Sequence, residues 1–458
     1  METAKKILVI LLFSLLIFCN SIPRTAIAQS LSSFDIQEMN LGLPNGTTFL
    51  NWYDAQSGHH GSADYFGAYM TLPITDTLYL ALGSDLPAND SGDGSYFAKF
   101  DGNSLIGIAK PDEQGLHEMI YDGSLIHIAG TDPQPDTHAA GNHYTYNPAT
   151  NVFTKYRDEV NGLVNVYHTW GLWKSVGKLF AAVSAHDGSD PATCNYGVSC
   201  FGEIFSSDNN GQTWTKLSPL GGYRAYDIIG FNNALYAIYN DSAEGALTMT
   251  KSTDGGGHWN AINGLSANLR RVHLIEFNQQ LVAVSFDRAS LYAVNGTDQA
   301  TSHSLPSGYL VGITYSFSGT SYTDYNIMAV AKGYLYLIAE KQSLTPQTVI
   351  LRTNDMVHWE HVADSSARLI SIAYWSYRDW LVLASPGSSA TLKYIDLHGN
   401  PTAIRIRSVQ SAHSFFNGLE AMLLVGLVSV ILGIRVFFHR EEKEKNKVFG
   451  YKIWKKDV

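Results

Sequence analysis

Polar and aromatic side chains recur at the expected starts of the inner strands of this chain. Three of these strand starts carry arginine, and Arg224, Arg271 and Arg368 are candidate binding residues. A planar guanidinium donates two parallel hydrogen bonds to a carboxylate, so arginines gathered from separate strands can hold an acidic ligand. His168 and Trp170 occupy a similar place and are further candidate binding residues. The whole set comprises Asp64, Tyr65, His117, Glu118, Tyr167, His168, Trp170, Arg224, Tyr226, Asp227, Arg270, Arg271, His273 and Arg368.

Three members of this set could support hydrolysis of a glycosidic bond. Glycosidases use a pair of carboxyl groups, and a tyrosine can replace one of them as the nucleophile. Asp64, Glu118 and Tyr226 are the candidate catalytic residues on this basis. An arginine or carboxylate at such a position is also an ordinary structural salt-bridge partner. We therefore prefer a binding role without catalysis, with a glycoside hydrolase as the alternative.

Acidic loops in the early part of the chain could coordinate calcium, because carboxylate oxygens are its usual ligands. Loops of Asp, Asn, Gly and Ser are also what solvated turns look like. No other cofactor is expected, and the 16 histidines show no His-x-x-x-His or His-Glu-x-x-His spacing for a metal. The acidic residues of these loops are Asp85, Asp90, Asp93, Asp132, Asp136, Asp187, Asp190, Asp241 and Glu244.

The charge balance excludes a common class of partner. The formal net charge is −10, and the segment before the basic C-terminal tail is more acidic than this figure suggests. An acidic surface does not attract nucleic acid or an anionic membrane surface. The chain also lacks a Gly-x-Ser-x-Gly elbow, a Walker loop and a dinucleotide fingerprint.

Three short segments share a turn pattern that ends in tryptophan. The first reads Ser-x-Asn-x-Gly-x-Thr-Trp, and hydroxyl and amide or carboxylate groups at this spacing can accept hydrogen bonds from a tight turn. Glycine supplies the left-handed position, and tryptophan packs a large apolar face between sheets. The residues that carry this pattern are Ser207, Asn209, Gly211 and Trp214, then Ser252, Asp254, Gly256 and Trp259, then Thr353, Asp355 and Trp359 in a shortened copy.

These segments resemble the Asp-box hairpins of sialidase-type (BNR) repeat proteins. The resemblance implies a β-propeller in which each box closes the outer hairpin of a blade, away from the ligand site. It also implies that arginines would clamp a substrate carboxylate in the alternative, sialidase-like enzyme. The early Arg-Ile-Pro motif of that family is absent here. Since related propellers include both enzymes and receptors, the fold does not decide the function.

The middle of the chain predicts an all-β protein built as one propeller. Short β-rich runs are separated by Gly, Asn, Asp and Ser, and the spacing of the runs suits blades of about 40–60 residues. We expect one domain over 58–400, with ring closure aided by a segment at 29–57. The count favours seven blades, with six or eight as alternatives. The units are 58–112, 113–158, 160–219, 222–265, 268–306, 308–363 and 366–400.

The two ends of the chain predict export and anchoring. Residues 1–28 have the basic start, apolar run and Ala-x-Ala exit of a signal peptide. Residues 401–418 are the expected stalk, and 419–438 the expected transmembrane helix, whose apolar run at 421–438 is about 27 Å long and could cross a membrane. The basic tail, 439–458, is expected in the cytoplasm by the positive-inside rule. The protein is thus expected to be a single-pass type I protein of the cell membrane.

Two further features agree with an extracellular location. Cys194 and Cys200 are close enough in sequence to form a small disulfide loop. Four sequons for N-glycosylation begin at Asn45, Asn89, Asn240 and Asn295. The expected function is a membrane-anchored extracellular propeller that binds a glycan or a protein.

Overall fold

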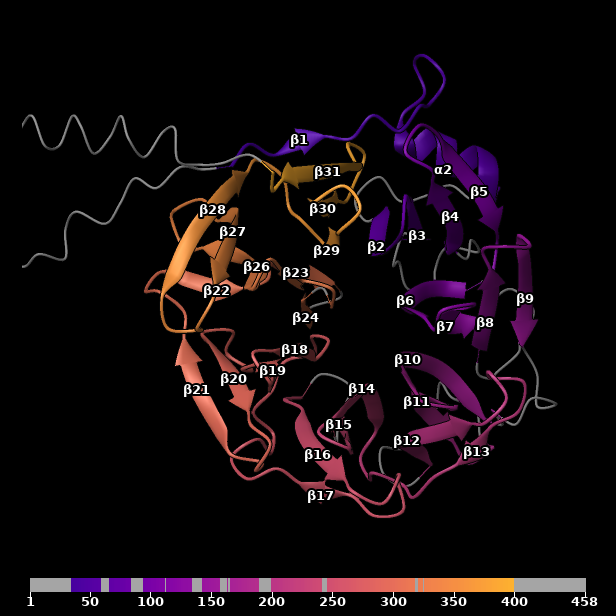
Figure 1. Cartoon of the computed structure of the whole chain (residues 1–458), viewed down its shortest axis with the longest axis vertical. Helices are drawn as coiled ribbons and strands as arrows, with labels where there is room; N and C mark the ends of the chain where they lie inside the picture. The colour runs from indigo at the N-terminus through magenta and orange to yellow at the C-terminus, as the bar shows by residue number, and fades with distance from the viewer. Residues whose placement is uncertain are drawn as a thin grey trace, which may run out of the picture. The chain divides into compact units, whose positions relative to one another are not determined.

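The strands of this chain form sheets arranged as a ring around a common centre, as Figure 1 shows. The computed structural model describes residues 34–58, 66–83, 94–111, 113–133, 142–156, 163, 165–188, 199–240, 245–317, 320–323 and 325–398. These residues belong to one unit, Ser33–Gly399. The described part contains one α-helix, α2 (Phe49–Ser57), and is otherwise built from strands. The predicted all-β propeller fold is therefore confirmed.

Four sheets contain four antiparallel strands each. The first is β2 (Gly67–Ile74), β3 (Thr77–Gly83), β4 (Tyr96–Phe100) and β5 (Leu105–Ala109). The second is β14 (Arg224–Phe231), β15 (Ala234–Asn240), β16 (Thr248–Ser252) and β17 (Asn260–Ala261). The third is β18 (Ile275–Phe277), β19 (Gln280–Val284), β20 (Ser290–Val294) and β21 (Ala300–Ser304). The fourth is β1 (Gln37–Glu38), β31 (Thr391–Asp396), β30 (Trp380–Ser385) and β29 (Ser371–Trp375).

The remaining strands form three other sheets. A five-stranded sheet contains β22 (Tyr309–Val311), β25 (Met328–Ala331), β26 (Tyr334–Lys341), β27 (Gln347–Thr353) and β28 (Trp359–Ser365). A two-stranded hairpin contains β23 (Thr314–Phe317) and β24 (Thr320–Thr323). An eight-stranded sheet contains β6 (Glu113–Tyr121), β7 (Ile126–Pro133), β8 (Asn142–Asn147), β9 (Val152–Tyr156), β10 (Val166–Ser175), β11 (Lys178–His186), β12 (Cys200–Ser207) and β13 (Thr215–Lys216).

The predicted count of seven separate blades is not confirmed. Four four-stranded sheets and the five-stranded sheet make five separate one-blade sheets, whereas the units expected at 113–158 and 160–219 share the eight-stranded sheet. Its halves, β6–β9 and β10–β13, join where His168 of β10 pairs with Thr131 of β7. A single backbone pairing of this kind leaves no pattern in the sequence, so the repeats alone could not reveal the merger.

Central strands of the sheets are buried on both faces, because neighbouring sheets pack against each face. In β3, Leu78, Leu80 and Leu82 pack into one apolar core, which also contains residues of β29–β31. The alternate residues Tyr79 and Ala81 pack into the next core, with residues of the eight-stranded sheet. Successive side chains of a strand point to opposite faces, so one short apolar run fills two cores.

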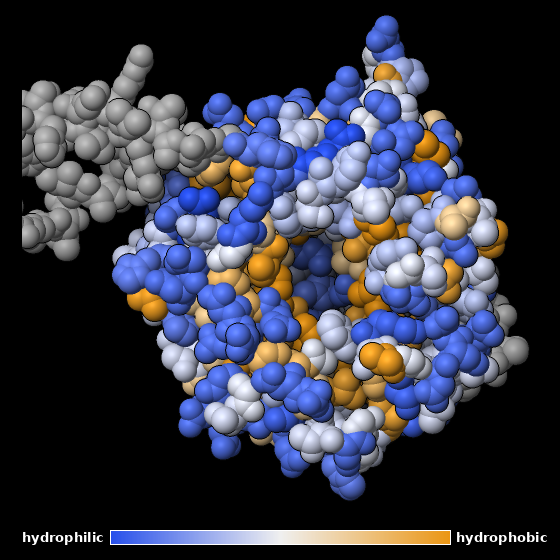
Figure 2. Space-filling view, viewed as in Figure 1, coloured by the Kyte–Doolittle hydropathy of each residue, from blue (hydrophilic) through white to orange (hydrophobic). Residues whose placement is uncertain are grey.

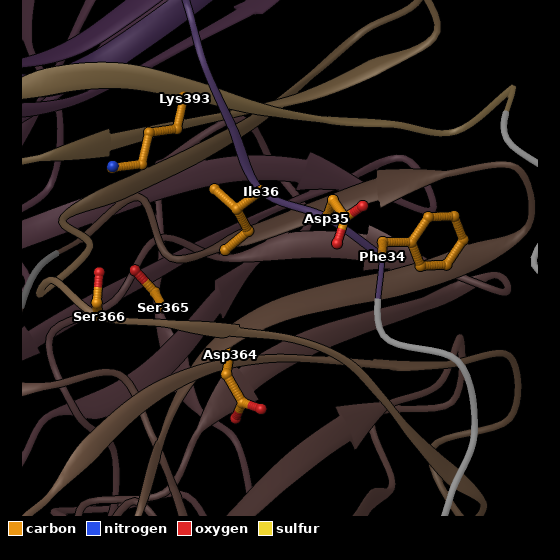
Figure 3. A pocket seen from close by; sticks show the side chains of 7 residues that line it. All are labelled: Phe34, Asp35, Ile36, Asp364, Ser365, Ser366 and Lys393. Atoms are coloured by element: carbon orange, nitrogen blue, oxygen red, sulfur yellow. The ribbon is translucent and has the colours of Figure 1, made fainter.

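The first described residues connect the outer edges of two sheets. The amide of Phe34 donates to the carbonyl of Val362, 2.7 Å away, and β1 then pairs with β31. This segment covers a polar cavity of about 230 Å³ (Figure 3). The cavity is lined by Phe34, Asp35, Ile36, Asp364, Ser365, Ser366 and Lys393. The N-terminal segment thus supplies the outermost strand of the last sheet.

The three tryptophan-bearing turns share one hydrogen-bonding pattern. Ser207 Oγ accepts the amide of Gly211 at 2.8 Å, and Ser252 Oγ accepts the amide of Gly256 at the same distance. Thr353 Oγ1 likewise accepts the amide of Met356. In each turn a second side chain, Asn209, Asp254 or Asp355, accepts the amide of the residue before the tryptophan. The indoles that follow are Trp214, Trp259 and Trp359.

Several predicted features lie outside the described residues. They are the signal peptide, the stalk, the apolar segment 419–438, the basic tail and Cys194. Within the described ranges, no helix is long and apolar enough to span a bilayer. Cys200 is disulfide-bonded. Asn240 is only 2% exposed in β15, so its sequon could not carry a glycan in this fold.

Candidate functional site

Four inner strands of the ring, β2, β6, β10 and β14, carry a β-bulge near their first residues, and the bulges of the last three concern the site. The register shifts between Leu116 and Glu118 in β6, between Thr169 and Gly171 in β10, and between Ala225 and Asp227 in β14. A bulge leaves its extra residue outside the ladder and can redirect that side chain. The extra residues are His117, Trp170 and Tyr226.

The rings of these bulge residues meet one another. The ring centroids of His117 and Trp170 are 4.7 Å apart, and those of Trp170 and Tyr226 are 5.3 Å apart. Tyr325, just before β25, lies 5.2 Å from His117, and His168 lies 4.8 Å from Trp170. Trp170 Nε1 donates to Ser184 Oγ at 2.8 Å, which fixes the indole. We call this group the central cluster; with the charged groups described below it comprises His117, Glu118, Tyr167, His168, Trp170, Tyr223, Arg224, Tyr226, Asp227, Arg271, His273 and Tyr325.

Two guanidinium groups converge on the indole of Trp170. The Arg271 guanidinium carbon lies 5.3 Å from the Trp170 centroid, 5.1 Å from Tyr226 and 4.2 Å from Tyr325. The Arg224 guanidinium lies 5.6 Å from the same indole and 4.5 Å from the ring of Tyr223. Cations are attracted to the faces of aromatic rings, most strongly where water is excluded.

Arg224 is held by tyrosines. Its Nη2 donates to the hydroxyl of Tyr223 at 2.8 Å, and its Nε is shielded from solvent without a hydrogen-bond partner among the described residues. No carboxylate in the described ranges forms an ion pair with it. Burial opposes the charge of Arg224, but the hydroxyls of Tyr226, Tyr223 and Tyr167 raise its pKa above the usual value. Burial also raises the pKa of Tyr167, so this phenol is neutral and the arginine is a cation.

A charged triad borders the aromatic rings. His273 Nδ1 lies 3.0 Å from Glu118 Oε2 and 3.4 Å from Asp227 Oδ1. Burial disfavours the imidazolium, but Glu118 and Asp227 outweigh it and raise the pKa of His273 well above its usual value. Burial also raises the pKa of Glu118, against the opposing effect of His273. The carboxylate of Asp227 accepts the amides of Ile228 at 2.8 Å and Leu274 at 2.6 Å.

The carboxylate spacing bears on the hydrolase alternative. The ligand oxygens of Glu118 and Asp227 and the nitrogen of His273 all lie within 4.8 Å of one another. Retaining glycosidases place their two carboxyl groups about 5–5.5 Å apart with the substrate between them. Here His273 bonds both carboxylates. The same three residues are the group among the described residues that could hold a metal ion.

Six of the eight residues predicted from the sequence for the site lie in the central cluster. They are Glu118, Tyr226, Arg224, Arg271, His168 and Trp170, which contact one another or share a neighbour. Arg368 is partly buried just before β29 and is not part of the contacts described above. Asp64 lies outside the described residues, as do most of the acidic loop residues considered for calcium.

Sequence reasoning did not single out four important members of the cluster. His117, Asp227 and His273 belong to the set of polar residues at strand starts, but no spacing marked them as partners. Tyr325 follows the β23–β24 hairpin, which interrupts the repeat and hides its place at the start of an inner strand. The signal that could have found it is a tyrosine just ahead of the apolar run that begins at Ile327, in the place that Tyr226 holds before Ile228.

Comparisons with known proteins give a fold but no family. No family model matches the chain, and no curated protein matches it, so membership of the Asp-box family is not confirmed. A catalytically inactive virginiamycin B lyase from Staphylococcus aureus, solved with quinupristin, is similar at 12% identity over 79% of this chain and 99% of that chain, with a TM-score of 0.47. A streptogramin B lyase is similar at 11% identity over 79% and 97%, with a TM-score of 0.46.

A nidogen/laminin complex provides a third similar structure. Its identity is 11% over 58% of this chain and 90% of that chain, with a TM-score of 0.36. At these identities and scores, none of the three structures carries an argument about the activity of this chain.

Proposed function

We propose that the ring binds an acidic ligand, a glycan or a protein segment carrying a carboxylate, at the central cluster. The observation that carries this proposal is Arg224. Its guanidinium is packed among aromatic rings, with a tyrosine hydroxyl as its hydrogen-bond partner and no carboxylate ion pair among the described residues. A partly buried cation packed among apolar rings without a counter-charge is costly, and an anionic ligand would supply that charge.

The aromatic rings suit the rest of such a ligand. Trp170 and Tyr226, which are buried, form apolar walls beside the two guanidinium groups. Sites of this composition combine apolar walls with a few placed polar groups that orient the ligand. One face of the ring is hollowed at its centre, with hydrophobic residues around the hollow (Figure 2).

The proposal is tested by direct binding. The purified full chain is titrated calorimetrically with N-acetylneuraminic acid, galacturonic acid and the neutral sugar galactose, and with an acidic and a neutral peptide. We expect binding of at least one acidic probe and none of its neutral counterpart. Equal binding of acidic and neutral probes, or binding of neither, would contradict the proposal.

A glycoside hydrolase of sialidase-like type is the second candidate. The observation that favours it is that His273, which bonds Glu118 and Asp227, packs on Tyr325, and Arg271, which contacts Tyr226, packs on the same ring. Release of chromophore from a panel of aryl glycosides, including a sialoside, would establish it, and Glu118→Gln should then abolish the release. Binding of a sialoside without its hydrolysis would support a binding function and contradict the hydrolase.

We also propose a location for the ring. We place the ring outside the cell, exported by residues 1–28 and held at a membrane by 419–438. Protease treatment of intact cells tests this, because an extracellular ring would be degraded without lysis.

A further inference from the structure

We propose that Glu118, Asp227 and His273 form a binding site for one divalent ion of the Zn²⁺ or Mn²⁺ class. The three residues come from different parts of the ring: Glu118 from β6, Asp227 from β14, and His273 from the segment before β18. Each offers one ligand atom, and the three atoms lie within 4.8 Å of one another.

The distances match the edges of a coordination polyhedron. His273 Nδ1 lies 3.0 Å from Glu118 Oε2 and 3.4 Å from Asp227 Oδ1. With metal–ligand bonds of about 2.1 Å, adjacent ligands stand about 3.0 Å apart at octahedral angles and about 3.4 Å apart at tetrahedral angles. An ion could therefore enter with little movement of these two atom pairs.

The site is also held in place before any ion enters. Asp227 receives the amides of Ile228 and Leu274, and the second of these bonds fixes the backbone beside His273. Glu118 is 8% exposed and Asp227 is 4% exposed. Hydrogen-bonded carboxylates in a sheltered position are typical of metal ligands with an ordered outer shell.

A second, independent observation concerns the other nitrogen of His273. Its Nε2 is shielded from solvent and has no hydrogen-bond partner among the described residues. Nδ1 is therefore the ring nitrogen that has polar partners among the described residues, and both partners are carboxylate oxygens. An ion bound at Nδ1 would have the same two oxygens within reach as further ligands.

The ligand atoms indicate the class of ion. Two carboxylate oxygens and one imidazole nitrogen suit Zn²⁺, Mn²⁺ or Fe²⁺, whereas Mg²⁺ and Ca²⁺ prefer oxygen throughout. Three protein ligands leave a position for water or for an oxygen of a bound ligand. The aromatic rings and Arg271 border this position, because His273 and Arg271 both pack on Tyr325.

The test uses the metal-stripped full chain titrated separately with Zn²⁺, Mn²⁺, Mg²⁺ and Ca²⁺. We expect one Zn²⁺ or Mn²⁺ per chain, at least about tenfold weaker binding in His273→Gln, Glu118→Gln or Asp227→Asn, and weaker binding of Mg²⁺ and Ca²⁺. The matched control is Asp254→Asn, because Asp254 and His258 form an exposed ion pair of 2.6 Å outside the cluster. This control should bind the ion as the parent protein does.

A spectroscopic measurement avoids the question whether a variant folds. Cu²⁺ bound to the unmodified chain should show hyperfine coupling to one imidazole nitrogen, and Zn²⁺ should displace it. Absence of stoichiometric binding to the unmodified chain, or undiminished binding in folded His273→Gln, would overturn the metal site. Acidic-probe binding is measured without metal, so failure of the metal site and failure of the proposed function are separate results.

Discussion

Arg224 is the residue on which binding of an acidic ligand should depend most. We expect Arg224→Gln to weaken the binding of the acidic probe at least about tenfold, equivalent to about 1.4 kcal/mol, because the guanidinium supplies the charge. The free energy of unfolding should not fall by a comparable amount, since the variant removes a partly buried cation that has no carboxylate partner among the described residues. Calorimetric titration and chemical denaturation measure the two quantities.

Arg378 provides the matched control. Its guanidinium also stacks on indoles, 4.8 Å from Trp375 and 5.0 Å from Trp380, but outside the central cluster. Arg378→Gln should leave the affinity for the probe unchanged. Equal affinity of the Arg224 variant and the parent protein would remove Arg224 from the site.

Gly211 shows how closely a turn can pack against a neighbouring unit. A Cβ at this position would lie 2.1 Å from Cε1 of His143, and φ is +80°. Gly177 has a similar φ of +72°, with no atom within 4 Å of the added Cβ. Replacing either glycine with alanine places a side chain in the left-handed region, which costs about 1–2 kcal/mol. Gly211→Ala also makes the new Cβ overlap the ring of His143.

We expect Gly211→Ala to lower the free energy of unfolding by about 1–3 kcal/mol more than Gly177→Ala does. Denaturant unfolding of the two variants measures the difference. Equal values would mean that His143 moves aside without cost.

At the scale of elements, the tryptophan-bearing hairpins depend on one buried hydroxyl each. Ser207 is 2% exposed, and its Oγ accepts the amide of Gly211. Ser207→Ala should cost about 1–3 kcal/mol, because it leaves a buried N–H without an acceptor. Ser304→Ala, at an exposed position of β21, should change stability by less than about 0.5 kcal/mol. A loss no larger than this control would show that water replaces the hydroxyl.

The elements themselves could largely be predicted from the sequence, whereas their irregularities could not. Runs such as Leu78 to Leu82 indicate a strand because each residue fills a core, and the turn residues mark the hairpins. The bulges at His117 and Tyr226 have no such pattern, since they arise from the pairing of two strands. The site could therefore be predicted as a set of residue types at strand starts, but the pairing of His273 with Glu118 and Asp227 could not.

At the scale of the whole molecule, a row of buried polar groups runs across the eight-stranded sheet. His127 Nε2 lies 3.1 Å from Asp122 Oδ2, and His127 Nδ1 lies 3.1 Å from His143 Nε2. The ring of His143 contacts that of Trp214, in the other half of the sheet, at 5.3 Å. Lys174 of β10 is the other charged group close by, 3.8 Å from Asp122.

This row predicts a loss of stability in mild acid. Burial lowers the pKa of His143 well below its usual value and also lowers that of His127, although Asp122 opposes the effect on His127. The unfolded chain therefore binds more protons below about pH 6.5. The contribution of these two histidines to the free energy of unfolding should be constant above this pH and fall progressively below it.

Denaturation at a series of pH values between about 7.5 and 5 measures this dependence. A His143→Asn variant, which removes one of the two histidines, should show a shallower fall. An unchanged slope in the folded variant would place the responsible group elsewhere.

The pairing of β1 with β31 determines when the ring can close during translation. Gln37 is among the first described residues to be synthesised, yet its strand partner, Tyr394, is among the last. The ribosome must translate almost the entire ring before β1 can pair with β31. Nascent chains of intermediate length therefore expose an unpaired sheet edge. Chains truncated a few residues before Thr391 should accumulate with chaperones, because they lack the strand with which β1 pairs.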